Sequence, residues 1–268
     1  MISKTHYTNK DISEGLAQLG IGSSDTVYLT GDFGNLGFHE SKTKLGTLQG
    51  FHESLASVIG ETGTMIVPTH SFSLCNTDIP FDLENTPSQR GAFTDYVRKL
   101  PGAVRQFHPF GSLTAWGKQA ESVTGNTSRH AYGPNTPYER LLACDAWGLS
   151  VAMPPQLTCS IVHHMEMTMA VPYRYTKEFL HPVVRDGKIS IEPFYLFVTY
   201  LEADLERDRN EKFFQHPLMQ EHVRKVQVGM NHLYAYRMRT FEQAVRDSMT
   251  KDIYAWLRRP PVQRPYQR

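Results

Sequence analysis

The sequence predicts an α/β fold with a mixed, largely buried central sheet and helices on both of its faces. Apolar segments at 26–30, 64–69 and 147–153 are short and bounded by turn residues, as expected for strands buried on both faces. The segment 47–60 has the apolar spacing of an amphipathic helix. It leads through the turn 61–63 into the strand 64–69, an order typical of βαβ units, so part of the sheet is expected to be parallel.

The amino-terminal half divides into alternating helices and strands. In chain order we expect a helix, a strand, a glycine-rich turn, a helix, a strand and a long loop, at 11–19, 26–30, 31–37, 47–60, 64–69 and 70–90. Asp11 and Glu14 are spaced as a capping box for the first helix. The loop is long for a compact domain, and loops of this kind are more often functional than idle.

The carboxyl-terminal half continues the same pattern. Helical segments are expected at 91–100, 118–123, 158–170, 217–228 and 240–257, with a further helix starting at 136–139, and strands at 112–116, 147–153, 187–200 and 233–237. Thr136 and Glu139 are spaced as a capping box around Pro137. Because no repeat or linker interrupts the chain, we predict one domain over residues 1–257. The Pro- and Arg-rich tail 258–268 is expected to be flexible.

Composition excludes several classes of protein. The chain has 268 residues, and 28 basic against 27 acidic side chains give a net charge of +1, which leaves no excess for general nucleic-acid binding. No apolar run approaches the roughly 20 residues of a membrane-spanning helix, and residues 1–7 lack the apolar core of a signal peptide. Cys75, Cys144 and Cys159 form neither a disulfide framework nor a CxxC site. We therefore expect a cytoplasmic protein without membrane insertion.

The predicted helix 158–170 carries the main candidates for chemistry. Residues three and four apart share a helix face, so Cys159, His163 and Glu166 are expected together. His163 and Glu166 suit a general base and its orienting carboxylate, although such a pair is more often a modest surface contact. A Cys159–His163 thiolate pair is a further option. A metal-dependent hydrolase using His163, His164 and Glu166 is disfavoured, because adjacent helical histidines point about 100° apart and HExxH is absent.

Two further sites are weaker on their own. Pro109 forces His108 out of helical geometry, which makes it a candidate binding residue in an irregular segment. The glycine-rich turn 31–37 matches neither GxGxxG nor GxxxxGK[ST], so nucleotide binding of the Rossmann or P-loop type is poorly supported. A serine triad is not indicated either, because no GxSxG elbow occurs.

Taken in chain order, several segments resemble the aminoglycoside 3-N-acetyltransferase family, over roughly residues 10–257. The similar motifs lie at 61–69, at Phe81-Asp82 with Thr86-Pro87-Ser88 and Gly91, at Pro101–Arg105 with His108-Pro109, Ser112 and Ala115–Gly117, at Gly133, Thr136-Pro137 and Arg140-Leu141, at His163 and Glu166, and at Val171–Arg174 with Lys177. Each motif is weak alone, whereas the ordered set is specific. The resemblance implies that family's α/β fold, and transfer of an acyl group, usually acetyl, from coenzyme A to an amine.

The resemblance also implies roles for residues. In the family pattern His163 is the general base, Glu166 orients it or binds substrate, and His108 supports it. Coenzyme A contacts are implied at Thr30, Gly31, Gly34, Ser88 and Ser112, and acceptor contacts at Asp82, Tyr173 and Arg174, with no metal. The chain departs from the family at 30–37, where the usual His and serines are replaced, and at 153–155, where two prolines replace a glycine-rich turn.

The acceptor amine is the least determined partner. Aminoglycosides carry several positive charges, whereas this chain is nearly neutral and its segment 174–188 is basic. We therefore expect a neutral or anionic amino sugar, such as a nucleotide-linked one. The alternatives are an aminoglycoside acetyltransferase that confers resistance, and a non-catalytic binding member of the same fold. The oligomeric state stays open, with a homodimer as one option.

Overall fold

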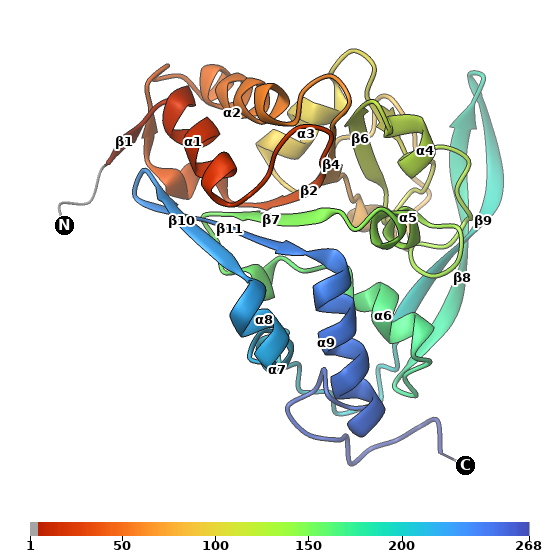
Figure 1. Cartoon of the computed structure of the whole chain (residues 1–268). Coiled ribbons are helices and arrows are strands. Elements are labelled where there is room, and N and C mark those ends of the chain that lie inside the picture. The colour runs from red at the N-terminus through yellow and green to blue at the C-terminus, as the bar shows by residue number, and fades with distance from the viewer. Residues whose placement is uncertain (1–4, 268) are drawn as a thin grey trace.

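The computed structural model describes residues 5–267, so residues 1–4 of the predicted domain and residue 268 of the predicted tail lie outside it. A seven-stranded mixed sheet crosses the molecule between two helical layers (Figure 1). Its strands, in spatial order, are β10 (Arg224–Val228), β11 (Asn231–Arg237), β7 (Trp147–Val151), β2 (Thr26–Gly31), β4 (Thr64–Pro68), β6 (Leu113–Gly117) and β5 (Val104–Arg105). This architecture confirms the predicted fold class.

The three predicted buried strands form the centre of the sheet. β2 lies between β4 and β7 and runs parallel to both, while the outer strands β11 and β6 pair antiparallel to this central group. Every residue of β4 and β7 is buried. Since strands inside a parallel sheet are covered on both faces, their unbroken apolar runs follow from this position.

Helices cover both faces of the sheet. The first layer contains α1 (Asn9–Gln18), α2 (Lys44–Ile59) and α3 (Ala92–Arg98), packed on one core that includes Val27 and Leu29. The second face carries α5 (Pro137–Ala143), α6 (Val162–Thr168), α7 (Glu211–Phe214), α8 (Pro217–His222) and α9 (Met238–Lys251), packed on a core that includes Tyr28. Val27 and Tyr28 thus face opposite layers, as neighbours on a strand must.

A long antiparallel hairpin stands apart from the sheet at one side of the molecule (Figure 1). It pairs β8 (Arg174–Arg185) with β9 (Lys188–Thr199) along their whole length. The remaining short elements are β1 (His6–Tyr7), β3 (Phe38–His39), α4 (Ala120–Thr124) and the 3-10 turns η1 (Phe33–Leu36), η2 (Phe72–Leu74) and η3 (Pro155–Leu157). In the part of the chain that the structure describes, no helix is long and apolar enough to cross a membrane.

Three helices have boundaries that differ from those predicted. The segment 217–228 is split, because Val223 adopts an extended conformation and the strand β10 follows it. The terminal helix stops at Lys251, six residues before the predicted end, where Asp252 is extended. The predicted helix 158–170 is reduced to α6, preceded by a turn. In each case the apolar spacing does not mark the helix boundary, which is set by the local backbone conformation.

The two predicted capping boxes also need correction. The first helix begins earlier, and its box joins Thr8 and Asp11 rather than Asp11 and Glu14. At α5 the start is as predicted, but the Thr136 hydroxyl donates to the Gly133 carbonyl and makes no cap. Spacing alone therefore located these helices without identifying the capping contacts.

Candidate active site

The candidate site lies beyond the carboxyl ends of the three parallel strands. β2 runs into the glycine-rich turn 31–37, β4 into the loop that carries His70, and β7 into the segment 152–161 before α6. Open α/β sheets bind ligands at this edge, where neighbouring strands connect in opposite directions. The fold thus brings three sequence-distant segments together.

A buried carboxylate connects His163 to Arg174. Glu166 is completely buried, and its Oε2 lies 2.6 Å from His163 Nδ1. Its Oε1 lies 3.0 Å from Arg174 Nε, and Arg174 is itself nearly buried. His163 keeps 28% of its side chain exposed, so its ring faces open space while the other two groups do not.

The end of α6 explains how Arg174 reaches this position. Ala170 adopts a left-handed conformation with φ 53°, and the N–H of Val171 donates to the Glu166 carbonyl. The N–H of Ala170 donates to the Met167 carbonyl, which completes a Schellman motif. The chain therefore reverses, and the first residue of β8 returns to the helix beside the Glu166 side chain.

The environment fixes the charge states of this group. Burial alone would raise the pKa of Glu166, but the His163 hydrogen bond and the Arg174 charge outweigh it, so its pKa is lowered. Burial lowers the pKa of His163, and Glu166 opposes that shift only in part. The arrangement thus supplies a neutral imidazole held by an ionised carboxylate, as general-base catalysis near neutral pH requires.

His163 lies where two pockets meet. The large pocket, of about 890 Å³, and the narrow pocket, of about 380 Å³, share Ser160, His163 and Arg207. A third cavity of about 660 Å³, the glycine-turn pocket, shares Arg90 with the narrow pocket and Met153 with the large one. A ligand in any of the three could therefore extend toward His163.

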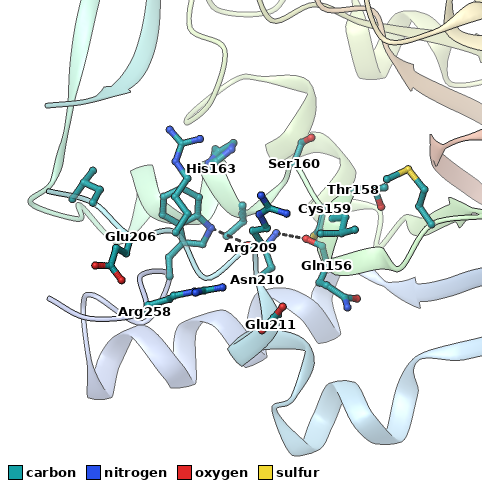
Figure 2. A pocket seen from close by; sticks show the side chains of 16 residues that line it. Gln156, Thr158, Cys159, Ser160, His163, Glu206, Arg209, Asn210, Glu211 and Arg258 are labelled. Carbon is teal, nitrogen blue, oxygen red and sulfur yellow. Dashed lines mark hydrogen bonds between the residues drawn. The ribbon is translucent and has the colours of Figure 1, made fainter. Parts of the chain in front are cut away.

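Figure 2 shows the large pocket, several of whose residues were not predicted from the sequence. Trp256 lies 5.5 Å from His163 between ring centroids, and Arg174 and Arg207 stack over it. Arg209 and Arg258 also line the pocket. The only sequence signal for these residues was the clustering of arginine at 207–209 and in the supposed tail.

His70 was also missed, although it lines the narrow pocket with His163. Its ring is buried, and its Nε2 has no hydrogen-bond partner among residues 5–267. Burial, with the nearby Arg90 charge, lowers the pKa of His70 to about 3. His70 is therefore a second neutral imidazole beside the site.

Only some of the residues predicted to contact coenzyme A line the glycine-turn pocket. Gly31 and Gly34 line the glycine-turn pocket, and Thr30 precedes it at the end of β2. Ser88 bonds to Thr94 and lies beside the pocket-lining residues 89–93 without lining the pocket itself. Ser112 is fully buried and donates to the Thr69 carbonyl, away from all three pockets.

The predicted acceptor contacts are also separated. Arg174 lines the narrow pocket, whereas Tyr173 is fully buried. Asp82 lines none of the three pockets, and its carboxylate accepts hydrogen bonds from the backbone N–H groups of Glu84 and Asn85. Of these three residues, only Arg174 borders the space around His163.

His108 lies apart from the three pockets. It is fully buried, and its Nδ1 accepts from the N–H groups of Phe110 and Gly111. Burial lowers its pKa to about 4. These contacts tie His108 to the loop that follows it.

The positions of Cys159 and His164 do not support the thiolate and metal-hydrolase alternatives at α6. Cys159 precedes the helix, so it does not share the face of His163 as expected, and burial raises its pKa to about 12. His164 points elsewhere and accepts from the Gly133 N–H. Among residues 5–267, no group of three or more His, Cys, Asp or Glu side chains is arranged to hold a metal ion.

Comparison with known proteins decides the family. A sequence model described as aminoglycoside 3-N-acetyltransferase matches residues 36–250. The chain belongs to this family. This confirms the predicted family and its class, the acetyl-CoA-dependent N-acetyltransferases, with acetyl coenzyme A as cosubstrate.

Individual relatives have low sequence identity to this chain, but the similarity extends over about two thirds of its length. The chain is 27% identical over 208 residues to aminoglycoside N(3)-acetyltransferase VII of Streptomyces paromomycinus, covering 68% of this chain and 67% of that protein. It is 26% identical over 207 residues to aminoglycoside N(3)-acetyltransferase III of a Salmonella species, covering 69% of each.

Solved structures confirm the fold. Aminoglycoside acetyltransferase AAC(3)-Xa superposes with a TM-score of 0.80 at 20% identity, covering 92% of this chain and 93% of the other. AAC-IIIb, solved as a binary complex with coenzyme A, also gives 0.80 at 19% identity, covering 92% and 97%.

Proposed function

We propose that this family member transfers the acetyl group of acetyl coenzyme A directly to the amine of an amino sugar, with His163 as the general base. The observation that carries the proposal is the Glu166–His163 pair at the junction of two pockets. One pocket can then hold the thioester and the other the acceptor, with the base between them. A direct transfer of this kind needs no covalent enzyme intermediate.

The chemistry follows from the hydrogen bond at Nδ1. Because ionised Glu166 only accepts, the Nδ1 proton of His163 points to it, and Nε2 is left as the basic nitrogen. Nε2 takes a proton from the acceptor nitrogen as that nitrogen attacks the thioester carbonyl carbon. The carbonyl electron pair moves to oxygen, then returns and expels the coenzyme A thiolate. The products are the amide and free coenzyme A.

We propose that the acyl donor approaches through the glycine-turn pocket. Its lining includes Gly31, Gly34, Lys44 and Arg90, and backbone amides with cationic side chains suit phosphate groups. Arg90 also borders the narrow pocket, which provides a continuous route toward His163. The departure from the usual family residues at 30–37 is compatible with this route, because backbone groups can replace hydroxyls.

We propose an amino-sugar acceptor that is neutral or anionic, such as a nucleotide-linked one, rather than an aminoglycoside. Arg207, Arg209 and Arg258 line the large pocket, against Glu206 and Glu211. Glu206 already pairs with Arg259. A polycationic substrate would meet a positive surface here, which costs binding energy. A location in the cytoplasm, where acetyl coenzyme A is available, is part of this proposal.

A substrate panel tests the proposal. Acetyl coenzyme A binding is measured by calorimetry, and turnover is followed by thiol release with neutral amino sugars, nucleotide-linked amino sugars and kanamycin-type aminoglycosides. We expect acetyl coenzyme A to bind and the non-cationic sugars to be the better acceptors. Efficient turnover of aminoglycosides would favour the resistance enzyme, and failure to bind acetyl coenzyme A at millimolar concentration would favour a binding protein.

A further inference from the structure

We propose that Arg207, Arg209 and Arg258, called here the arginine wall, form an anion-binding subsite that holds a phosphate or carboxylate of the acceptor. The inference rests on the proposed function, and it narrows the acceptor from neutral or anionic to anionic. The three side chains line the large pocket together with His163, and Figure 2 labels Arg209, Arg258 and His163 around it. An acceptor anchored at the wall can present its amine to the base in the same pocket.

The wall has unused binding capacity. All three guanidinium groups belong to exposed residues, and none of them makes a hydrogen bond or ion pair with a side chain of residues 5–267. Arg207 stacks on Trp256 at 5.6 Å, which leaves the edge of its guanidinium free. Arginine binds phosphate and carboxylate through two parallel N–H donors, so free guanidinium groups in one pocket suit such anions.

A strained segment holds Arg209 in this place. Arg209 and Asn210 both adopt left-handed backbone conformations, with φ 56° and 65°, which residues other than glycine rarely do. Asn210 is buried, and its Nδ2 donates to the Gln156 carbonyl at 2.9 Å. Its Oδ1 accepts from the Trp256 indole N–H at 3.0 Å. Strain that the surroundings maintain so firmly is characteristic of functional sites.

The carboxyl-terminal segment completes the wall. The backbone N–H of Arg258 donates to the Glu206 carbonyl, and that of Asp208 donates to the Trp256 carbonyl. Lys212 Nζ donates to the Leu257 carbonyl at 2.5 Å. The loop 205–211 and the segment 256–258 are thus joined into one unit, which includes the first residue of the predicted flexible tail.

The wall extends across the carboxyl-terminal limit of the family match. Trp256 and Arg258 lie beyond the matched residues 36–250, whereas His163 and Glu166 lie within them. Arg207 and Arg209 lie within the matched residues, so the wall joins a loop inside the matched region to a carboxyl-terminal segment beyond it. A shared acetyl-transfer centre can then serve an acceptor of opposite charge to an aminoglycoside.

Inorganic pyrophosphate is the probe for this subsite. It is titrated by calorimetry into the full-length protein saturated with coenzyme A, so that the donor phosphates cannot account for binding. We expect the wild type to bind, and the double variant Arg209→Gln/Arg258→Gln to bind at least about tenfold more weakly. Arg264→Gln, a carboxyl-terminal arginine whose Nε donates to the Pro261 carbonyl, is the matched control and should bind like the wild type.

A second variant separates position from charge. Asn210→Gly keeps the left-handed backbone but removes both clamping hydrogen bonds, so it should weaken pyrophosphate binding without any change in net charge. Binding by the double variant equal to wild type would overturn the inference, as would competition between pyrophosphate and coenzyme A. If the wild type fails to bind coenzyme A, the proposed function fails, and titration of the coenzyme-free protein still tests the wall.

Discussion

At the residue scale, Glu166 sets the protonation state of His163. The carboxylate holds the Nδ1 proton and raises the pKa of a ring that burial lowers. The sequence could predict this pair because i,i+3 spacing is a local property of a helix. It could not predict Trp256 or Arg207, because their approach to His163 depends on the path of the chain after α9 and β9.

Glu166→Gln tests this dependence through the pH profile. Activity requires neutral His163, so kcat/KM should fall as pH drops through its pKa, which lies below the usual value of about 6.5. The variant loses the charge that raises this pKa, so the acidic limb should move to lower pH while kcat decreases. The decrease should be smaller than the roughly 100- to 10,000-fold expected for loss of the base. An unshifted limb with full kcat would remove Glu166 from this role.

Cys159→Ser tests the thiolate alternative. The Cys159 Sγ accepts a hydrogen bond from the Tyr236 hydroxyl at 3.1 Å and stays a buried thiol, because burial raises its pKa to about 12. A serine oxygen can accept the same hydrogen bond. Turnover of the variant is therefore expected within a few fold of wild type, and a thiol-alkylating reagent should leave the native enzyme active. Inactivation by either treatment would revive the thiolate mechanism.

At the element scale, the strand ends determine where ligands can bind. The central strands and most helices followed from apolar patterning, whereas β10 was predicted as part of a helix. Its five residues, Arg-Lys-Val-Gln-Val, continue a helical segment without a glycine or proline to separate them. Pairing with β11 decides the conformation here, and tertiary pairing has no signal in a single short segment.

The turn after β2 provides a prediction at this scale. Gly31 has φ 129°, and a Cβ there would lie 2.1 Å from the Val151 carbonyl oxygen. Gly31→Ala should therefore disturb the pairing of β2 with β7 and lower the free energy of unfolding by more than about 1 kcal/mol. Gly34→Ala is the matched control, because its nearest atom would be Asp32 Oδ1 at 3.3 Å. Equal stability of the two variants in urea unfolding would argue against the strained turn.

At the scale of the whole molecule, folding brings the loop 205–211 and the segment 256–258 to the pocket that His163 also lines. The near-zero net charge argues against general nucleic-acid binding, but it does not show how charge is distributed over the surface. The arginine wall concentrates positive charge on one side of a pocket in a nearly neutral chain. Such clustering cannot be read from composition, because it arises when the loop 205–211 meets the segment 256–258.

Buried histidines predict acid sensitivity of the entire fold. Burial lowers the pKa of His70 to about 3, and of His108 and His164 to about 4, so these groups stay neutral in the folded state. The unfolded chain binds their protons below about pH 6.5, and stability is therefore lost as pH falls from 6.5 toward 4. With two to three protons taken up on unfolding, the loss near pH 5 should be about 3–4 kcal/mol per pH unit.

Urea unfolding at pH 7, 6 and 5 measures this loss. A free energy of unfolding that stays constant over the series would contradict the buried, neutral state of the three histidines. The lowered pKa of Glu166 acts in the same direction at still lower pH, since its stabilising contribution is lost as the carboxylate is protonated.

The central claim is that His163 removes the proton from the acceptor amine. The most direct measurement compares acetyl transfer and coenzyme A affinity for wild type and His163→Ala, with the best acceptor from the substrate panel. If His163 is the base, kcat should fall by about 100- to 10,000-fold while coenzyme A affinity stays nearly unchanged. A variant that keeps most of its kcat would contradict this claim and assign the base to another group.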